Sequence, residues 1–585
     1  MTVIGTAGHV DAGKSTLIQA LTGTHPDRWA EERERGLTID LGFASLTTAD
    51  GIEVSFVDVP GHVKFLRNML AGAGGIAGVL FVVAATDGWR AQSDEHLAIL
   101  NVLGVERAVV VITRVLQVGD DRRGELRAEI ADRLSTTGLA GSPIVDADPP
   151  SGVGLDEVTE QLASMVRRVP PAPDHRRPRL WIDRSFTIRG AGTVVTGVLS
   201  DGAISVGEEL VVAPLGASVR VRGLQRHGTA VERAEPGQRV AVNLSGLAPD
   251  QIGRGDALVR AGDWHLADTL DVDLQVLDTL DHPVRRTGAY SLHLGTAERS
   301  VRLRVIQSDA VAAGSGGAVR LRVDGKVTAR PGDRFVLREF GRDETVGGGE
   351  VLDVDPQLPT LRATPDRSVR RVVAERGRIQ VDHLRRVTGT DAPWDQVEVI
   401  GDWAMVADEL DRRRVELAER IRTSDRGLSL AELDDIDRRL VLDLDGVDRQ
   451  GDRLVIAGTQ LSDAAAQLLS QLDAAGAQPA QPDTSQRAAA AELARAGRII
   501  RCGEFWFAGT AINDVIKVVA SEMTGHDSGA TAGQLRDALG TTRRFLIPLL
   551  EWCDATGRTR RRGDVRIPGP RSGIALEPID LRQGG

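Results

Sequence analysis

The octapeptide GHVDAGKS at residues 8–15 constrains the fold more than any other stretch, because it fits the pattern G-x-x-x-x-G-K-[ST]. A strand pattern precedes it and a helix pattern follows. In such a unit the loop N–H groups surround a phosphate, a lysine adds positive charge and a hydroxyl suits Mg²⁺. The motif predicts a nucleotide-binding α/β domain, whose loop contacts come from Gly8, His9, Val10, Asp11, Ala12, Gly13, Lys14, Ser15 and Thr16.

Two later motifs support a nucleoside triphosphate as the ligand. The apolar segment VSFVDVPGH (54–62) ends in Asp58-x-x-Gly61, where the carboxylate can hold Mg²⁺ through water and the Gly61 N–H can contact the γ-phosphate. The segment RGLTID (35–40) supplies Thr38 as a second hydroxyl ligand. The predicted metal ligands are therefore Ser15, Thr38 and Asp58.

Strand and helix patterns alternate through the first 170 residues. Apolar strands at 78–85, 107–113 and 142–147 alternate with helices expected over 91–103, 121–136 and 154–167. This alternation predicts a doubly wound parallel sheet, with the phosphates at the carboxyl ends of its strands. The first predicted domain is residues 1–170.

The rest of the chain changes character twice. After the proline-rich segment 169–179, short β-rich segments separated by glycines predict two antiparallel β-barrels, at 176–262 and 263–356. Helices followed by paired strands come next, with Gly-Asp or Gly-Glu turns at Gly401, Gly451, Gly503 and Gly563. This repeat predicts tandem winged helices, two within 360–460 and two within 461–585.

Positive charge collects near the end of an acidic chain. The formal net charge is -11, which argues against general polyanion binding, yet residues 536–571 hold nine arginines and four acidic residues. A predicted helix start and a predicted strand carry most of them, and together they predict an RNA-binding surface. The alternative is a solvated charged face. The predicted RNA contacts are Arg543, Arg544, Arg558, Arg560, Arg561 and Arg562.

Targeting features are lacking in the sequence. No apolar run approaches the roughly 20 residues that cross a bilayer, and the first residues do not resemble a signal peptide. Two cysteines are too few for a disulfide framework. We therefore expect a cytoplasmic protein without membrane contact.

The order of GHVDAGKST, RGLTI and DVPGH resembles the elongation-factor group of translational GTPases. The resemblance implies GTP and Mg²⁺ as cofactors, and it implies a catalytic set of His62, Lys14 and Thr38 in which His62 orients the attacking water. The alternative for His62 is a helix-capping role. Thr113 and Arg114 match the family's base-binding segment and complete the predicted nucleotide contacts.

Within that group, GLTIDLGFA (36–44) and IDRSFTIRGAGTVVTG (182–197) resemble the selenocysteine-specific elongation factors. That branch implies an aminoacyl pocket at Asp183, Arg184 and Arg239, whose guanidinium groups would favour a selenolate over a serine hydroxyl. The alternative is that these residues form ordinary surface ion pairs. The implied partners of a monomer are selenocysteinyl-tRNA, the ribosome and an mRNA hairpin at recoded UGA codons.

Two rival functions remain from the sequence. One is another GTPase of this type, either a general elongation factor or a sulfate-activating GTPase subunit, although such proteins do not carry the winged-helix tail. The other is a nucleotide-gated regulator that binds RNA or DNA, against which the barrel residues argue.

The guanine-reading segment departs from the family pattern. The family has Thr/Asn-Lys-x-Asp, whereas this chain has Thr113-Arg114-Val115-Leu116, and leucine accepts no hydrogen bond. A missing acceptor typically costs about 1–3 kcal/mol, which would erode selectivity for guanine. Asp120 or Asp121 could substitute, and the family's Ser-Ala base contact is also altered, to Asp146-Ala147.

Overall fold

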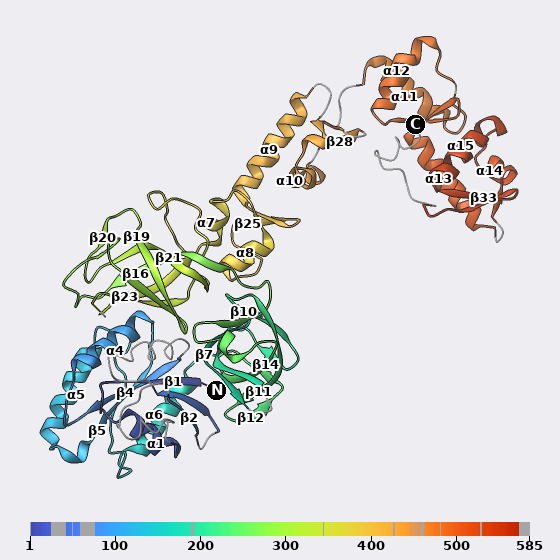
Figure 1. Cartoon of the computed structure of the whole chain (residues 1–585). Coiled ribbons are helices and arrows are strands. Elements are labelled where there is room, and N and C mark those ends of the chain that lie inside the picture. Colours follow the sequence, from blue (N-terminus) through green and yellow to red (C-terminus); the bar gives the residue numbers. More distant parts are fainter. Residues whose placement is uncertain are drawn as a thin grey trace. The chain divides into compact units, whose positions relative to one another are not determined.

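The computed structural model describes residues 2–24, 42–48, 51–58, 76–188, 192–342, 344–424, 428–444, 446–450, 453–456, 461–479, 481–526 and 529–571. The chain divides into two units, Met1–Val397 and Glu398–Gly585. The first unit contains the predicted nucleotide-binding domain and barrels, and the second contains most of the helical remainder (Figure 1).

A six-stranded sheet forms the start of the first unit, in the order β2-β3-β1-β4-β5-β6. All neighbouring strands are parallel except β2 and β3. The strands are β1 Thr2–Ala7, β2 Gly42–Thr47, β3 Glu53–Asp58, β4 Gly78–Ala84, β5 Ala108–Thr113 and β6 Ile144–Asp146. The predicted doubly wound domain is confirmed.

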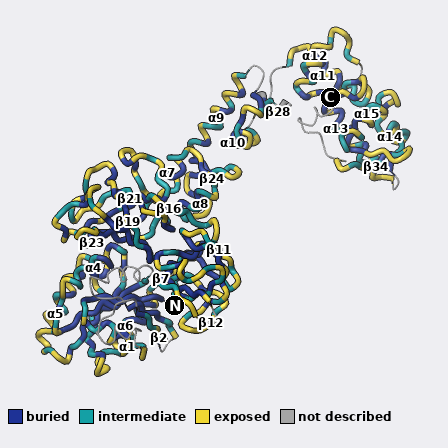
Figure 2. Tube along the Cα trace, in the orientation of Figure 1, coloured by how far each residue is buried: buried dark blue, intermediate teal, exposed yellow. Residues whose placement is uncertain are grey.

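Helices cover this sheet because its strands are apolar on both faces. Every residue of β4 is buried, as Figure 2 shows for the central strands. The helices are α1 Lys14–Thr22, α4 Ala91–Val102, α5 Asp120–Leu134 and α6 Leu155–Arg167. The bounds of α4, α5 and α6 lie within two residues of the predicted helices, and the proposed domain boundary at residue 170 falls just after α6.

The first barrel closes through six strands in the order β10-β15-β7-β8-β14-β11, with β11 also pairing with β10 and with the short strand β12. Alternate residues of these strands fill its interior. The strands are β7 Arg179–Ile188, β8 Gly192–Ser200, β10 Glu209–Ala213, β11 Ala217–Arg226, β12 Thr229–Val231, β14 Arg239–Ser245 and β15 Ala257–Val259. A short pair, β9 Ile204–Ser205 and β13 Arg233–Ala234, lies beside them.

The second barrel is a closed ring in the order β16-β21-β19-β18-β22-β23. Its strands are β16 Leu266–Val276, β18 Tyr290–Leu294, β19 Ala297–Val305, β21 Gly316–Thr328, β22 Arg334–Glu339 and β23 Glu344–Asp353, and β17 Val284–Arg285 pairs with β20 Ala310–Val311. Both predicted barrels are therefore confirmed as antiparallel and closed.

A buried arginine joins the two barrels. Arg179 of β7 donates to the carboxylate of Asp333 at 2.5 and 2.8 Å and to Asp201 at 3.2 Å. Its guanidinium carbon also lies 4.4 Å from the ring centroid of Trp264. Because Asp333 precedes a strand of the second barrel, this network fixes one barrel against the other.

The helical remainder begins in the first unit with α7 Val369–Ala374, β24 Ile379–Gln380 and α8 Val381–Thr388. The strands β25 Val397–Ile400 and β26 Trp403–Val406 follow, and the boundary between the two units falls at Val397. The first proposed winged helix is thus divided between the units.

Three further strand pairs flank the predicted glycine turns of the second unit. They are β28 Val447–Gln450 with β29 Arg453–Ile456, β30 Ile499–Cys502 with β31 Phe505–Ala508, and β33 Thr559–Arg562 with β34 Val565–Pro568. The Gly451 turn itself lies outside the described residues. The remaining elements are α9 Ala407–Thr423, β27 Leu428–Ser429, α10 Asp435–Leu440, α11 Asp463–Ala475, α12 Arg487–Arg495, α13 Gly509–Thr524, β32 Ala530–Thr531, α14 Ala532–Ala538 and α15 Arg543–Ala555.

The last two winged helices share one hydrophobic core. The helix α13 contributes Ile512, Val515 and Ile516 to a cluster that also holds Phe505 of β31 and Leu549 of α15. The predicted C-terminal winged helix is confirmed, since β32, β34 and β33 form a three-stranded sheet beside α14 and α15. Among the described residues, the helices are too short or too polar to span a bilayer.

Candidate functional site

The loop after β1 has the backbone that a phosphate site requires. Gly8 and Gly13 adopt positive φ angles of 125° and 90°, and a Cβ atom on Gly8 would lie 2.0 Å from the Val82 carbonyl oxygen. Only glycine fits at that position. Lys14 is buried, and its Nζ atom donates to the Gly8 and His9 carbonyl oxygens at 3.1 and 2.8 Å. The lysine charge therefore lies over the loop.

Two of the predicted metal ligands meet at the end of this loop. The Ser15 hydroxyl donates to Asp58 Oδ2 at 2.7 Å, and the Thr6 hydroxyl donates to Asp58 Oδ1 at 2.7 Å. Asp58 is fully buried. A hydroxyl beside a carboxylate is an all-oxygen donor set, which fits Mg²⁺. Thr38, Gly61 and His62 lie outside the described residues.

The segment after β4 supports the loop, and sequence reasoning missed it. The Gly8 N–H donates to His96 Nδ1 at 3.0 Å, and the Val10 N–H donates to Gln92 Oε1 at 3.0 Å. His96 is 1% exposed, and burial lowers its pKa to about 3, with the charge of Lys14 acting in the same direction. The imidazole is therefore a neutral acceptor. The available sequence signal was the presence of the polar residues Gln92 and His96 after β4, the strand that pairs with β1.

The predicted base-binding segment lies against the same loop. The Thr113 hydroxyl donates to the Ala12 carbonyl oxygen at 2.6 Å, and Arg114 donates to the Asp11 carbonyl oxygen at 2.6 Å. Leu116 is 63% exposed. Asp120 begins α5, so this alternative reader lies in the next helix, as expected. The structure thus brings Thr113 and Arg114 to the loop and leaves Leu116 exposed.

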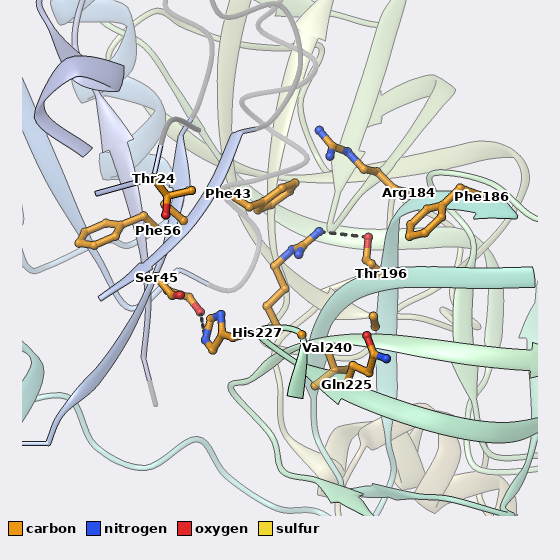
Figure 3. Close-up of a pocket in the computed structure, with 15 residues that line it drawn as sticks. Thr24, Phe43, Ser45, Phe56, Arg184, Phe186, Thr196, Gln225, His227 and Val240 are labelled. Carbon is orange, nitrogen blue, oxygen red and sulfur yellow. Dashed lines mark hydrogen bonds between the residues drawn. The ribbon is translucent and has the colours of Figure 1, made fainter. Parts of the chain in front are cut away.

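Two of the three predicted aminoacyl residues, Arg184 and Arg239, line a cavity of about 350 Å³ between the nucleotide-binding domain and the first barrel (Figure 3). Phe43 of β2 contributes its ring from one side, and Arg184 approaches from the barrel. Arg239 of β14 also lines the cavity. The guanidinium carbons of Arg184 and Arg239 lie 4.8 and 3.4 Å from the Phe43 ring centroid. Two cations therefore stack on one aromatic ring beside an accessible space.

Asp183 holds one of these cations. Arg239 donates through Nε and Nη2 to the two carboxylate oxygens of Asp183, each at 3.0 Å, and Nη2 also contacts the Thr196 hydroxyl at 3.0 Å. The side chain of Asp183 is 6% exposed. The ion pair considered from the sequence thus exists, but it is largely buried and fixes Arg239 at the cavity wall.

The arginines of the last winged helix fall into two groups. Arg543 and Arg544 are exposed at the start of α15, and the residues of β33 that were expected to bind RNA, Arg560, Arg561 and Arg562, are exposed as well. Arg558 is different. It precedes β33 and is 3% exposed, and its guanidinium carbon lies 5.1 Å from the ring centroid of Trp552. The prediction that Arg558 contributes to the RNA surface is therefore wrong, because its guanidinium packs in the domain interior.

Models of four protein families match successive parts of the chain. The elongation factor Tu GTP-binding domain matches residues 1–172, and elongation factor Tu domain 2 matches 192–259. The β-barrel domain of selenocysteine-specific elongation factors matches 271–358, and the winged helix of elongation factor SelB matches 523–567.

Curated relatives include selenocysteine-specific elongation factors of Desulfomicrobium baculatum and Escherichia coli, which are 38% and 39% identical over 353 and 357 residues. Each match covers 60% of this chain, and the chain spans only 55% and 56% of these relatives' lengths. Elongation factor Tu 2 of Streptomyces avermitilis is 31% identical over 385 residues, which are 60% of this chain and 96% of that protein.

Solved structures share the fold. A bacterial selenocysteine-specific elongation factor superposes with a TM-score of 0.69 at 23% identity, covering 97% of this chain and 100% of the other. The SelB factor of Methanococcus maripaludis, bound to the GTP analogue GppNHp, gives a TM-score of 0.54 at 25% identity over 61% of this chain and 79% of its own. With the phosphate loop, the two barrels and the terminal winged helix in place, the chain belongs to the elongation-factor family of translational GTPases and within it matches the selenocysteine-specific members.

Proposed function

We propose that the protein delivers selenocysteinyl-tRNA to ribosomes at recoded UGA codons, in a GTP-dependent reaction, while its last winged helix binds a hairpin of the mRNA. We place this activity in the cytoplasm and expect a monomer. The observation that carries the proposal is the cavity in which Arg184 and Arg239 stack on Phe43.

The charge of this cavity suits an anionic amino acid side chain. A selenol is more acidic than a thiol and is anionic at neutral pH, whereas the serine hydroxyl is neutral. Arg184 and Arg239 place two guanidinium groups at the cavity wall, and Asp183 pairs with Arg239. Guanidinium donors favour a selenolate over a neutral hydroxyl through charge-assisted contacts. The bidentate contact to Asp183 holds Arg239 in one orientation, which reduces the entropy lost on binding.

The phosphate loop holds the nucleotide that controls delivery. The loop amides and Lys14 bind the phosphates, and Ser15 and Asp58 are the described residues that would hold Mg²⁺, with Thr38 as the expected third ligand. When bound, the ion neutralises charge on the β- and γ-phosphates. Hydrolysis by this family requires positioning rather than a protein nucleophile, and we propose that His62 orients the attacking water.

The basic end of the chain provides the contact with RNA. The exposed arginines at the start of α15 and along β33 offer donors to phosphates, and an RNA hairpin presents phosphates and unstacked loop bases. Binding of the hairpin raises the local concentration of the factor near one ribosome. A general elongation factor or a sulfate-activating GTPase subunit is less well supported, because the SelB winged-helix model matches residues 523–567.

The test compares one tRNA charged with selenocysteine or with serine. We expect the GTP-bound protein to bind the selenocysteinyl form about tenfold or more tightly, as expected for a hydrogen bond to a charged group. The variant Arg184→Ala should lose most of this preference. Arg233→Ala is the matched control, since Arg233 lies on β13 beside the same barrel and pairs with Glu235 outside the cavity. Equal affinity of the unaltered protein for both tRNAs would refute the proposal.

A further inference from the structure

The guanine-reading position of this chain holds a leucine, but a carboxylate lies at the end of the next strand. We propose that Asp146, at the carboxyl end of β6, reads the guanine edge in place of the missing aspartate at position 116, and that Arg127 positions it. This inference rests on GTP binding at the loop of residues 8–15.

The sheet brings Asp146 to the base end of the nucleotide site. The phosphate loop follows β1, and β4, β5 and β6 extend from it in that order. The Thr113 hydroxyl holds the end of β5 against the loop through the Ala12 carbonyl oxygen at 2.6 Å. Because β5 and β6 are parallel and Ile112 pairs with Asp146, the carboxylate lies one strand beyond Thr113. A nucleoside leaving the phosphate loop reaches these two strand ends.

The neighbouring side chains are poorly suited to this role. Leu116 is apolar, and Arg114 is a donor whose guanidinium contacts the Asp11 carbonyl oxygen. Asp120 is 88% exposed at the start of α5 and is paired with Arg123. An exposed carboxylate on a solvated helix end gains little from one hydrogen bond to a base, because water competes for it.

Asp146 is held in place and keeps acceptor capacity. Arg127 donates from Nη2 to Asp146 Oδ1 at 2.7 Å and from Nη1 to the Ile144 carbonyl oxygen at 2.5 Å. Arg123 Nη1 lies 3.4 Å from Oδ2, beyond the usual hydrogen-bond range of about 2.7–3.2 Å. A carboxylate has about four acceptor sites, so sites remain for the N1–H and N2–H donors of guanine.

The simpler alternative is that Asp146 only ties α5 to β6 through Arg127. If Asp146 has only this structural role, its substitution should change the affinities for all purine nucleotides equally. If Asp146 contacts the base, its substitution should change the preference for GTP over XTP. Xanthine carries a C2 carbonyl where guanine carries the amine, so an amide donor complements it. The experiment therefore titrates GTP, XTP and ATP against one fluorescent GTP analogue, using the full-length chain and the variant Asp146→Asn.

We expect Asp146→Asn to bind GTP about 10- to 100-fold more weakly and XTP about tenfold more tightly than the unaltered protein. The matched control is Asp148→Asn, two residues along the chain, where Asp148 bridges Val153 through the backbone. This control should keep the original order of affinities. The double variant Leu116→Asp with Asp146→Asn should recover the preference for GTP, because the acceptor returns from the turn that follows β5.

Each possible result of these titrations either supports or overturns the proposed role of Asp146. An unchanged GTP-to-XTP ratio in Asp146→Asn would overturn the proposal, as would an equal loss for all three nucleotides that the double variant does not reverse. If the unaltered protein binds GTP no better than ATP and XTP, guanine is not read and this inference fails while nucleotide binding stands. If the unaltered protein binds none of the three, the proposed GTP-dependent function fails with it.

Discussion

His96 couples the stability of the phosphate-binding loop to pH. Its Nδ1 atom accepts the Gly8 N–H at 3.0 Å, and the side chain is 1% exposed. Burial lowers the pKa of His96 from 6.5 to about 3, and the charge of Lys14 acts in the same direction. A charged imidazole could not accept this hydrogen bond, so the folded domain keeps His96 neutral.

The sign of the effect follows from proton binding. Below pH 6.5 the unfolded chain takes up a proton on His96, whereas the folded domain does not until the pH approaches 3. The unfolded state therefore binds more protons, and the free energy of unfolding falls as the pH is lowered through this window. Between pH 7 and pH 5 His96 alone should remove about 2 kcal/mol, since one pKa unit corresponds to about 1.36 kcal/mol.

The variant His96→Asn tests this reasoning, because asparagine offers an oxygen near the position of Nδ1 but does not titrate. We expect the loss of stability between pH 7 and pH 5 to be smaller in the variant by about 2 kcal/mol. The measurement is urea-dependent hydrogen exchange of peptides from residues 2–24, read by mass spectrometry and corrected for intrinsic exchange at each pH.

The His96→Asn experiment has a matched control variant and one result that would contradict the reasoning. His175→Asn alters an exposed histidine of the linker before β7 and should leave the pH dependence unchanged. If His96→Asn shows the same pH dependence as the unaltered protein, the interpretation of His96 as a neutral buried acceptor is wrong.

Three further substitutions have defined consequences. Arg179→Met should lower the free energy of unfolding of the barrels by about 3–5 kcal/mol, measured by urea denaturation, because it removes the buried guanidinium that donates to Asp333 and to the buried carboxylate of Asp201. Gly8→Ala should abolish GTP binding in a titration, since its Cβ atom would lie 2.0 Å from the Val82 carbonyl oxygen. Arg558→Ala should destabilise the last winged helix by about 2 kcal/mol in thermal unfolding, through loss of a desolvated cation–π contact.

Each of these substitutions has a matched control. Arg233→Ala should leave the unfolding of the barrels unchanged, because its partner Glu235 is exposed. Gly124→Ala should stabilise α5 by about 0.5–1 kcal/mol, as it meets open space within a helix. Arg561→Ala should lower hairpin affinity and its salt dependence without changing the melting temperature, since Arg561 is exposed on β33. A reversed pattern within any pair would contradict the assigned role.

The sequence predicted correctly those elements in which a single requirement, such as complete burial or an unusual backbone conformation, governs the choice of residues. Strands such as β4 are apolar throughout and can only be central, and the glycine turns of the winged helices require backbone conformations that few residues adopt. Motif spacing also located Ser15 beside Asp58, which meet at 2.7 Å although 43 residues separate them. Local pattern and global fold agree at these positions.

The predictions that needed three-dimensional information were less complete. Arg558 lies two residues from the exposed Arg560, yet it turns inward onto Trp552, and sequence charge alone does not distinguish the two. His96 was overlooked because its partner is a backbone N–H of the loop rather than a side chain in a motif. Contacts made to the backbone leave little trace in a pattern of residue types.

The helix α13, Gly509–Thr524, determines where this protein can be truncated for structural studies of its RNA complex. A fragment that starts at residue 523, where the match to the SelB winged helix begins, would discard the helix that supplies Ile512, Val515 and Ile516 to the common core. Its remaining apolar surface would then face water and favour aggregation. A soluble piece for crystallisation or for NMR should start upstream of α11, so that this core and the cluster that α11 and α12 form with Ile499 and Ala508 are both retained.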